Sequence, residues 1–255
     1  MIVFKYGGHA ISEELKVDPI LAYLADLIKS GENIVIVHGG GPQINRELEI
    51  HGVKSEMVKG LRKTTTQVYE VVARTLSGEV LRNLTNQLVG LGINAVGISA
   101  GDGNLIRAKV TDSSLGLVGD VESIDVSVIQ NFIDQGLTPV ISPISVTREG
   151  VGLNMNADLV AGAIGGALGA ELVMFSTDVS GIYRNWPEES SLIGEISLSE
   201  LQSIAEGFEG GMSPKVNAAI TAITSGAKSV RIFDGTSVEN LRAAHSGKSG
   251  TLVVS

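Results

Sequence analysis

The sequence predicts an α/β fold built around a mainly parallel central sheet. Short apolar runs alternate with helix-length segments along the chain, which is the order expected when helices connect parallel strands. Glycine follows several of the predicted helices, at the position where a left-handed C-terminal cap favours it. With 255 residues, the chain is long enough for one large α/β domain or two closely packed lobes.

The apolar runs are short and rich in Ile, Val and Phe, as expected of strands buried on both faces of a parallel sheet. We expect six strands, at Ile2–Tyr6, Asn33–Val37, Ala95–Ser99, Thr138–Ser142, Leu172–Ser176 and Ser229–Phe233.

Helices fit the longer segments between these strands. Pro42 suits a first helical position, where its missing N–H costs nothing. Glycines stand just past five of the helices: Gly52, Gly92, Gly136, Gly169 and Gly226. We expect helices at Val17–Ser30, Pro42–His51, Thr66–Leu91, Asp125–Gln135, Asn156–Leu168, Leu198–Ala205 and Pro214–Ser225.

Two short hairpins and one lobe boundary complete the predicted organisation. On the rim of the sheet, Leu105–Val110 is expected to pair with Leu117–Val121, and Ile144–Val146 with Gly152–Leu153. A boundary near Gly169 is expected because the Ala/Gly-rich helix before it suits close packing on a sheet. The lobes would then be 1–169 and 170–255.

Composition excludes several classes of partner. The formal net charge of -9 argues against a nucleic acid or an anionic membrane, because both require a basic surface. Cysteine is absent, which excludes disulfides, thiolate metal sites and a cysteine nucleophile. No apolar stretch is both long and glycine-poor enough for a membrane helix, and a strand at the very start leaves no room for a signal peptide. We expect a cytoplasmic protein.

Two glycine-rich turns follow predicted strands and precede predicted helices. The first is Lys5-Tyr6-Gly7-Gly8 and the second is His38-Gly39-Gly40-Gly41-Pro42. Such turns leave backbone N–H groups unobstructed for an anion at a helix N-terminus, and a lysine beside one of them favours phosphate. The second turn is neither a P-loop nor a dinucleotide-binding fingerprint, because no Lys-Ser or Lys-Thr follows its glycines and the glycine spacing is wrong.

Four charged residues could complete a phosphate site. Lys5 lies in an apolar strand and needs an anionic partner, and Asp158 in the first turn of an apolar helix would serve. Lys215 falls in the first turn of a helix, where a cation opposes the helix dipole, so a negative ligand explains it better than stability does. Arg62 in a loop is either solvated surface or a fork for a carboxylate.

Six segments in this order resemble the amino acid kinase family, and most closely its members that phosphorylate N-acetyl-L-glutamate. The resemblance covers Met1 to Ser255 and implies a three-layer αβα sandwich. It also implies transfer of a phosphoryl group from MgATP to the side-chain carboxylate, a step of arginine biosynthesis that yields an acyl phosphate and ADP. The segments are Lys5–Ala10, His38–Asn45, Gly60–Arg62, Asn154–Asp158, Asp178–Tyr183 and Gly211–Asn217.

The resemblance also implies roles for individual residues. Lys5 and Lys215 would flank the transferring phosphoryl group as catalytic residues, with Asp158 holding both. Mg²⁺ would be held mainly by phosphate oxygens and water, with no protein metal site. The amino-acid substrate would contact Gly40, Gly41, Arg62 and Asn154. The nucleotide would contact Lys5, Gly7, Gly8, Thr177, Asp178, Ser180, Gly181, Tyr183, Gly211 and Lys215.

Three alternatives stay open at this stage. The stretch Trp186–Ser190 and the ending from Asp234-Gly235-Thr236 through Ser246-Gly247 are reminiscent of kinases that act on an amino acid carried by a small acidic protein. Arg62 is also followed by Lys63-Thr64-Thr65, where the family more often shows Val-Thr-Asp. The rim formed by Lys54, Lys59, Arg62 and Lys63 would receive such a partner. The second alternative is a protein that binds a nucleotide but does not transfer its phosphoryl group. The third is a kinase that acts on a nucleoside monophosphate or on carbamate.

The resemblance extends to assembly and regulation. Arginine-inhibited relatives carry an additional N-terminal helix that links dimers into rings, whereas the first strand here begins at Ile2. The C-terminal segment also lacks the family's arginine-site pattern. We expect a homodimer, paired through Thr66–Leu91 and not inhibited by free arginine.

Overall fold

The computed structural model describes residues 1–7, 17–208 and 210–255. Within them, eight strands form one sheet: β1 (Ile2–Tyr6), β2 (Ile34–His38), β5 (Ala95–Ser99), β8 (Thr138–Ser142), β11 (Leu172–Thr177), β12 (Glu195–Ser197), β13 (Ser229–Asp234) and β14 (Thr251–Val254). Their order is β12-β14-β13-β11-β1-β2-β8-β5. The six from β13 to β5 are parallel, and β14 and β12 at one edge run against them.

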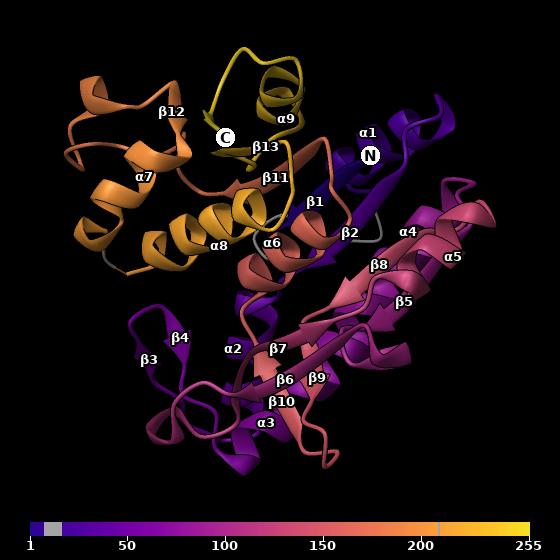
Figure 1. Cartoon of the computed structure of the whole chain (residues 1–255). Coiled ribbons are helices and arrows are strands. Elements are labelled where there is room, and N and C mark those ends of the chain that lie inside the picture. The colour runs from indigo at the N-terminus through magenta and orange to yellow at the C-terminus, as the bar shows by residue number, and fades with distance from the viewer. Residues whose placement is uncertain (8–16, 209) are drawn as a thin grey trace.

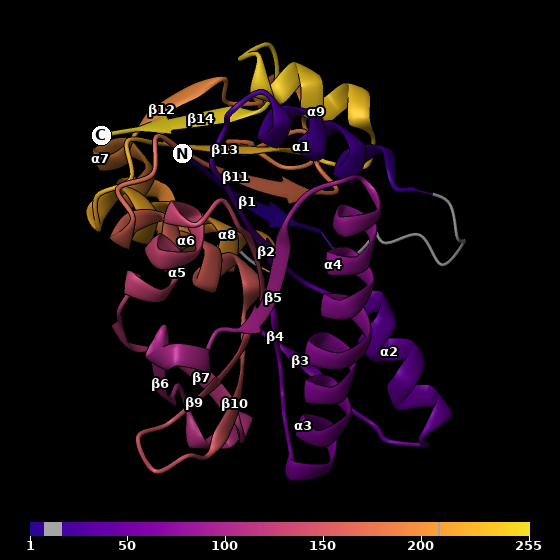
Figure 2. The same ribbon diagram turned by 90° about the vertical axis from the view of Figure 1, so that its right-hand side faces the viewer.

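Helices cover both faces of this sheet (Figures 1 and 2), so the predicted three-layer αβα sandwich is confirmed. Short 3₁₀ turns lie at Asp102–Asn104, Ser113–Leu115, Glu189–Ser191 and Ala205–Gly207. The described α-helices are α1 (Pro19–Lys29), α2 (Gly41–Ile50), α3 (Thr66–Ala73), α4 (Leu81–Gly90), α5 (Ser127–Asp134), α6 (Ala157–Ala167), α7 (Leu198–Ile204), α8 (Met212–Thr224) and α9 (Val238–His245). None of them combines the length and apolar composition needed to cross a lipid bilayer.

The two faces of the sheet bury separate hydrophobic cores. Side chains alternate along a strand, and in β1 the residues Ile2, Phe4 and Tyr6 join the core beneath α1, α4 and α9. Val3 joins the opposite core, beneath α5, α6 and α8. Lys5 is two residues after Val3, so its side chain faces α6 and α8. This alternation directs the one lysine of β1 towards the helices that carry Asp158 and Lys215.

The two predicted hairpins pair as expected but do not lie on the rim of the sheet. β6 (Ile106–Val110) is antiparallel to β7 (Val118–Ile124), and β9 (Ile144–Val146) is antiparallel to β10 (Gly152–Met155). Parallel contacts between β10 and β7 and between β6 and β9 then close the four strands into a small barrel, beside α3 in Figure 1. β3 (Met57–Val58) and β4 (Leu61–Arg62) form a separate two-stranded hairpin.

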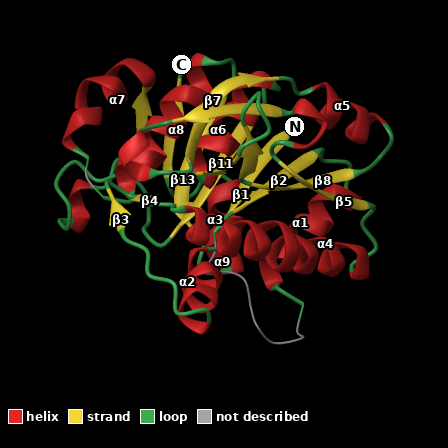
Figure 3. Ribbon diagram, turned by 90° about the horizontal axis from the view of Figure 1, so that it is seen from below, coloured by secondary structure: helices red, strands yellow, loops and turns green. Residues whose placement is uncertain are grey.

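The predicted long helix over Thr66–Leu91 is continuous but not uniform. Between α3 and α4 it contains a π-helical segment, Arg74–Val80, and such segments often occur near functional sites. The wider turn brings the hydroxyl of Ser77 to within 3.0 Å of the Ser99 hydroxyl and 2.8 Å of the Ser142 hydroxyl. The segment is therefore anchored to the carboxyl ends of β5 and β8. Figure 3 shows the row formed by α3 and α4 from below.

Candidate active site

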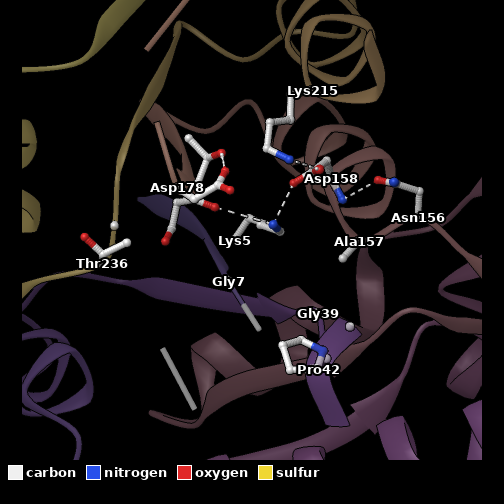
Figure 4. Close-up of a pocket in the computed structure, with 15 residues that line it drawn as sticks. Lys5, Gly7, Gly39, Pro42, Asn156, Ala157, Asp158, Asp178, Lys215 and Thr236 are labelled. Atoms are coloured by element: carbon white, nitrogen blue, oxygen red, sulfur yellow. Dashed lines mark hydrogen bonds and ion pairs between the residues drawn. The ribbon is translucent and has the colours of Figure 1, made fainter. Parts of the chain in front are cut away.

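The structure brings the three predicted catalytic residues together. Lys5 Nζ lies 2.9 Å from Asp158 Oδ1, and Lys215 Nζ lies 3.2 Å from Asp158 Oδ2. Asp158 is only 4% exposed and stands between the two ammonium groups in Figure 4. The two lysines also approach backbone carbonyls, Lys5 that of Ser176 and Lys215 that of Gly211, each at 3.4 Å.

Local features of the sequence produce this convergence. Asn156 caps α6 by accepting hydrogen bonds from the backbone N–H groups of Asp158 (2.8 Å) and Leu159 (3.2 Å), which fixes the first turn of the helix. Helix α8 can approach α6 because Gly162 has no side chain. A Cβ added there would lie 2.5 Å from the carbonyl oxygen of Ala218. This close packing places Lys215, in the first turn of α8, within reach of Asp158.

The electrostatics of the cluster favour an anionic ligand. Burial raises the pKa of Asp158, but the charges of Lys5 and Lys215 and their hydrogen bonds lower it by more, so the net shift is downward. The carboxylate is therefore ionised at neutral pH. One carboxylate between two ammonium groups leaves a net positive charge, and the charge of a bound phosphate would offset it.

A cavity of about 220 Å³ opens beside the cluster, and we call it the phosphate cavity. Its walls combine the cluster with the carboxyl ends of β1, β2, β11 and β13, where parallel α/β sheets bind ligands. Lys5, Pro42, Asp178 and Thr236 are among the wall residues labelled in Figure 4. The lining residues are Lys5, Gly7, Gly39, Gly40, Gly41, Pro42, Asn156, Ala157, Asp158, Ser176, Thr177, Asp178, Lys215, Gly235 and Thr236.

A second cavity, of about 160 Å³, adjoins the phosphate cavity across Gly39–Gly41 and contains every predicted amino-acid contact. We call it the acid cavity. The Arg62 guanidinium at its wall donates to Asn45 Oδ1 (2.6 Å) and Ser55 Oγ (2.9 Å). Burial lowers the pKa of Arg62 from its usual value, yet an arginine stays charged at neutral pH. Asn154, at 9% exposure, donates from Nδ2 to Thr64 Oγ1 (3.1 Å).

The remaining walls of the acid cavity are largely apolar. A pocket with one arginine, two amides (Asn154 and Asn156) and otherwise apolar or glycine walls fits a small molecule that carries a carboxylate at one end and an apolar group elsewhere. The apolar residues are Ile44, Met57, Leu61, Leu76, Val118, Pro143, Met155 and Ala157.

The third and largest cavity, about 650 Å³, shares Thr177, Asp178 and Lys215 with the phosphate cavity. We call it the nucleotide cavity because its size and its aromatic walls suit a base and a sugar. Tyr183 and Trp186 meet edge to face, with ring centroids 5.1 Å apart. The lining residues are Thr177, Asp178, Val179, Tyr183, Arg184, Asn185, Trp186, Gly207, Phe208, Gly211, Met212 and Lys215.

Some predicted contacts fall outside these cavities. Ser180 and Gly181 line none of the three. Gly181 instead packs against β14, because a Cβ on it would lie 2.5 Å from the Thr251 hydroxyl. Gly8 lies outside the described residues. The turn after Ser99 lines none of the three cavities and leads to β6 of the barrel.

Other cavity residues were missed by the sequence analysis. Gly235 and Thr236 directly follow β13, a strand that the sequence predicted. Their position at the carboxyl end of a parallel strand could have indicated that they line a ligand site. Trp186 and Phe208 lie in irregular segments that gave no such signal. Asn156, the N-cap of α6, also lines the phosphate and acid cavities.

The unusual Lys63-Thr64-Thr65 stretch has structural roles beside the acid cavity. Lys63 forms an ion pair with Glu56 at 2.7 Å. Thr64 is fully buried, donates its hydroxyl to the Arg62 carbonyl at 2.7 Å, and accepts from Asn154. Thr65 caps α3 by accepting from the Val68 N–H at 3.3 Å. The stretch therefore supports Arg62 and Asn154 from behind.

An αβα sandwich with a lysine-carboxylate-lysine cluster between two ligand-sized cavities defines a phosphate-handling protein of the α/β class. Comparison with known proteins makes the class more specific. The model of the amino acid kinase family matches residues 1–234, and the chain belongs to this family.

Individual relatives agree with that assignment. An acetylglutamate kinase from Corynebacterium glutamicum is 37% identical over 257 residues, covering 96% of this chain and 84% of the relative. One from Prochlorococcus marinus is 40% identical over 237 residues, covering 92% of this chain and 78% of the relative. The crystal structure of smu.665 from Streptococcus mutans UA159 is 30% identical with a TM-score of 0.83, covering 99% of this chain and 98% of that one.

Proposed function

We propose that this protein is an acetylglutamate kinase, which transfers the γ-phosphoryl group of ATP to the side-chain carboxylate of N-acetyl-L-glutamate. The observation that carries the proposal is the continuity of the three cavities. The acid cavity meets the phosphate cavity at Gly39–Gly41, and the phosphate cavity meets the nucleotide cavity at Thr177, Asp178 and Lys215. An acceptor and a donor bound at the two ends would meet beside Lys5, Asp158 and Lys215. The named relatives support the same substrate.

The acceptor needs orientation rather than activation. A carboxylate is ionised at pH 7, so its oxygen is already a nucleophile and no general base is required. Arg62 would bind the α-carboxylate with the N–H groups that Asn45 and Ser55 leave free, and Asn154 would contact the same end of the molecule. The apolar wall that includes Leu76 and Val118 would contact the rest of the substrate.

Transfer itself depends on positioning and charge. The carboxylate oxygen forms a bond to the γ-phosphorus while the bond from phosphorus to the bridging oxygen breaks, and ADP leaves with that electron pair. Lys5 and Lys215 would neutralise the charge that develops on the phosphoryl oxygens and on the leaving group. Asp158 would hold the two ammonium groups at a fixed separation.

The nucleotide would bring its metal ion with it. The described residues contain no group of three or more His, Asp or Glu side chains placed to hold a metal. This composition fits a Mg²⁺ ion carried mainly by phosphate oxygens and water. Asp178 lies at the junction of the phosphate and nucleotide cavities. Its carboxylate is of the type that could provide one further oxygen ligand to the Mg²⁺ ion. The ion would supply charge neutralisation for the β- and γ-phosphates.

The predicted lobes correspond to the two substrates in this proposal. All residues that line the acid cavity lie between positions 39 and 157, and all that line the nucleotide cavity lie between positions 177 and 215. We therefore assign amino-acid binding to 1–169 and nucleotide binding to 170–255. A cytoplasmic homodimer paired through Thr66–Leu91 follows from the family resemblance. Light scattering would then give twice the 26.6 kDa of one chain.

A carrier-bound acceptor is less well supported. The basic rim expected to receive an acidic carrier is largely occupied, because Lys63 pairs with Glu56 and Arg62 is held at the wall of the acid cavity. Lys54 and Lys59 remain exposed, which is a small surface for a protein partner.

Trapping of the product with hydroxylamine tests the proposal, because an acyl phosphate reacts with it to give a hydroxamate, which forms a coloured complex with added ferric ion. The protein would be supplied with MgATP and, separately, N-acetyl-L-glutamate, L-glutamate or L-aspartate. We expect hydroxamate with N-acetyl-L-glutamate alone. Absence of product with all three, from protein that still binds ATP, would contradict the proposal and favour a carrier-bound acceptor or a binding-only role.

A further inference from the structure

His38 is a buried side chain next to the candidate site that the proposed mechanism does not use. It ends β2 and immediately precedes the glycine turn Gly39–Gly41. The residue is 0% exposed. Its Nδ1 lies 2.9 Å from the carbonyl oxygen of Gly39.

The partner determines which ring nitrogen carries the proton. A carbonyl oxygen only accepts, so Nδ1–H donates to Gly39, and Nε2 is the unprotonated nitrogen. Nε2 has no hydrogen-bond partner among the described residues. Burial lowers the pKa of His38 to about 4, despite the opposing effect of the bond to Gly39. The ring is therefore a neutral donor at the pH of a cell.

The bond to Gly39 orients the next N–H group. In a planar trans peptide the carbonyl oxygen and the following N–H point in opposite directions. When the Gly39 carbonyl points at the buried ring of His38, the Gly40 N–H points away from it. Gly40 lines both the phosphate cavity and the acid cavity. In the described part of the chain, the N–H groups of Gly40 and Gly41 donate no hydrogen bond to the protein.

Packing and one hydrogen bond hold the Cα and the carbonyl group of Gly40. A Cβ at Gly40 would lie 2.7 Å from Leu76 Cδ2 and 3.3 Å from Val80 Cγ2, so the π-helical segment presses directly on its backbone. The Gly40 carbonyl accepts from Ile44 N–H at 2.9 Å in the first turn of α2. None of these contacts fixes the orientation of the peptide plane between Gly39 and Gly40. The hydrogen bond from the His38 ring to the Gly39 carbonyl does so.

We propose that His38 is a positioning residue that directs the Gly40 N–H at the anionic oxygen located where the phosphate and acid cavities meet. This inference rests on the proposed function, because that oxygen belongs to the transferring phosphoryl group or to the acceptor carboxylate. His38 does not touch the substrate. It acts through the Gly39 carbonyl, and its loss would leave the Gly40 N–H free to rotate away.

Amide side chains provide a test that separates position from bulk. The amide nitrogen of Asn lies about where Nδ1 lies, whereas that of Gln lies about where Nε2 lies. The variants are His38→Asn, His38→Gln and His38→Leu, with His51→Leu as the control at an exposed histidine just past α2. For each, kcat, the KM of both substrates and Tm are measured by hydroxamate formation and calorimetry. Binding of MgATP and MgADP is compared by titration calorimetry.

We expect kcat to fall at least about tenfold in His38→Leu and His38→Gln and to stay within about threefold of wild type in His38→Asn, because a misdirected oxyanion donor acts on the transition state. The ratio of the MgATP affinity to the MgADP affinity, measured without acceptor so that no turnover occurs, should fall in His38→Leu and His38→Gln and stay close to wild type in His38→Asn. Equal kcat in folded Asn and Gln variants, or wild-type kcat in His38→Leu, would overturn the inference. If wild-type protein forms no hydroxamate, the proposed function fails, and the order of nucleotide preference still decides whether His38 directs the Gly40 N–H.

Discussion

At the scale of single residues, Asp158 determines the electrostatics of the site. It is a buried carboxylate, and its desolvation is offset by two lysines that would otherwise repel each other. Removing its charge while keeping its shape is therefore expected to affect both stability and catalysis.

We predict that Asp158→Asn lowers the free energy of unfolding by about 3 kcal/mol at pH 7, since it leaves two partly buried ammonium groups without their counter-charge. The folded-state pKa of Asp158 lies below the unfolded value, so its contribution is present above pH ~4 and is lost as the pH falls through the folded pKa. Urea unfolding at pH 7 and pH 3 would measure this. The difference between wild type and variant should shrink in acid, and a constant difference would contradict the assignment.

Arg62 gives a second prediction at this scale. We expect Arg62→Ala to raise the KM for N-acetyl-L-glutamate by about tenfold or more with a small effect on the KM for ATP, because the guanidinium lines the acid cavity and not the nucleotide cavity. Arg148→Ala is the matched control, since that side chain is 70% exposed on the barrel. Loss of ATP binding with an unchanged KM for the acid would show that the cavities are wrongly assigned.

At the scale of elements, the close approach of α6 and α8 brings Asp158 and Lys215 together. Gly162 is the contact point, so Gly162→Ala should push α8 away from α6 and weaken the bond from Lys215 to Asp158. We expect a loss of about 1–3 kcal/mol from overpacking together with a lower kcat. Gly90→Ala at the end of α4, where nothing lies within 4 Å of the added Cβ, is the control. Unchanged kcat in folded Gly162→Ala protein would contradict the argument.

The loop after β11 supports a prediction about the nucleotide. Trp186 is 66% exposed, lines the nucleotide cavity, and is the single tryptophan of the chain. A base that stacks on an aromatic side chain gains about 1–3 kcal/mol. Binding of ATP should therefore change its fluorescence, and Trp186→Ala should raise the KM for ATP about tenfold. Fluorescence that does not respond to a saturating amount of ATP would place the base elsewhere.

At the scale of the whole molecule, the predictable part of the fold was the parallel core. Strands such as Ile2–Tyr6 are short apolar runs bounded by glycine and helix signals. β1, β5 and β8 have the predicted bounds, and β2, β11 and β13 differ from them by one residue at one or both ends. The edge strands β12 and β14 were not predicted, because pairing with a distant strand, rather than local pattern, defines them. The barrel was not predicted because its closure depends on contacts between two hairpins. The π-helical segment has the composition of an ordinary helix.

The candidate site was partly predictable for a similar reason. Lys5, Asp158 and Lys215 each sit where the local sequence leaves a charge without a structural explanation, and the structure joins them. Trp186 and Phe208 could not be assigned to a cavity, because irregular loops place them there. The tight contact of Gly60 with the Gly210 carbonyl, where an added Cβ would lie 2.6 Å away, likewise depends on two segments distant in sequence.

The central claim is that acceptor and donor meet at the lysine-carboxylate-lysine cluster. A crystal structure with N-acetyl-L-glutamate and a non-hydrolysable ATP analogue tests it most directly. We expect the γ-phosphate between Lys5 and Lys215, the acceptor carboxylate against the Gly40 and Gly41 N–H groups, and the α-carboxylate on Arg62. A γ-phosphate away from both lysines, or an acid bound outside the cavity of Arg62 and Asn154, would contradict it.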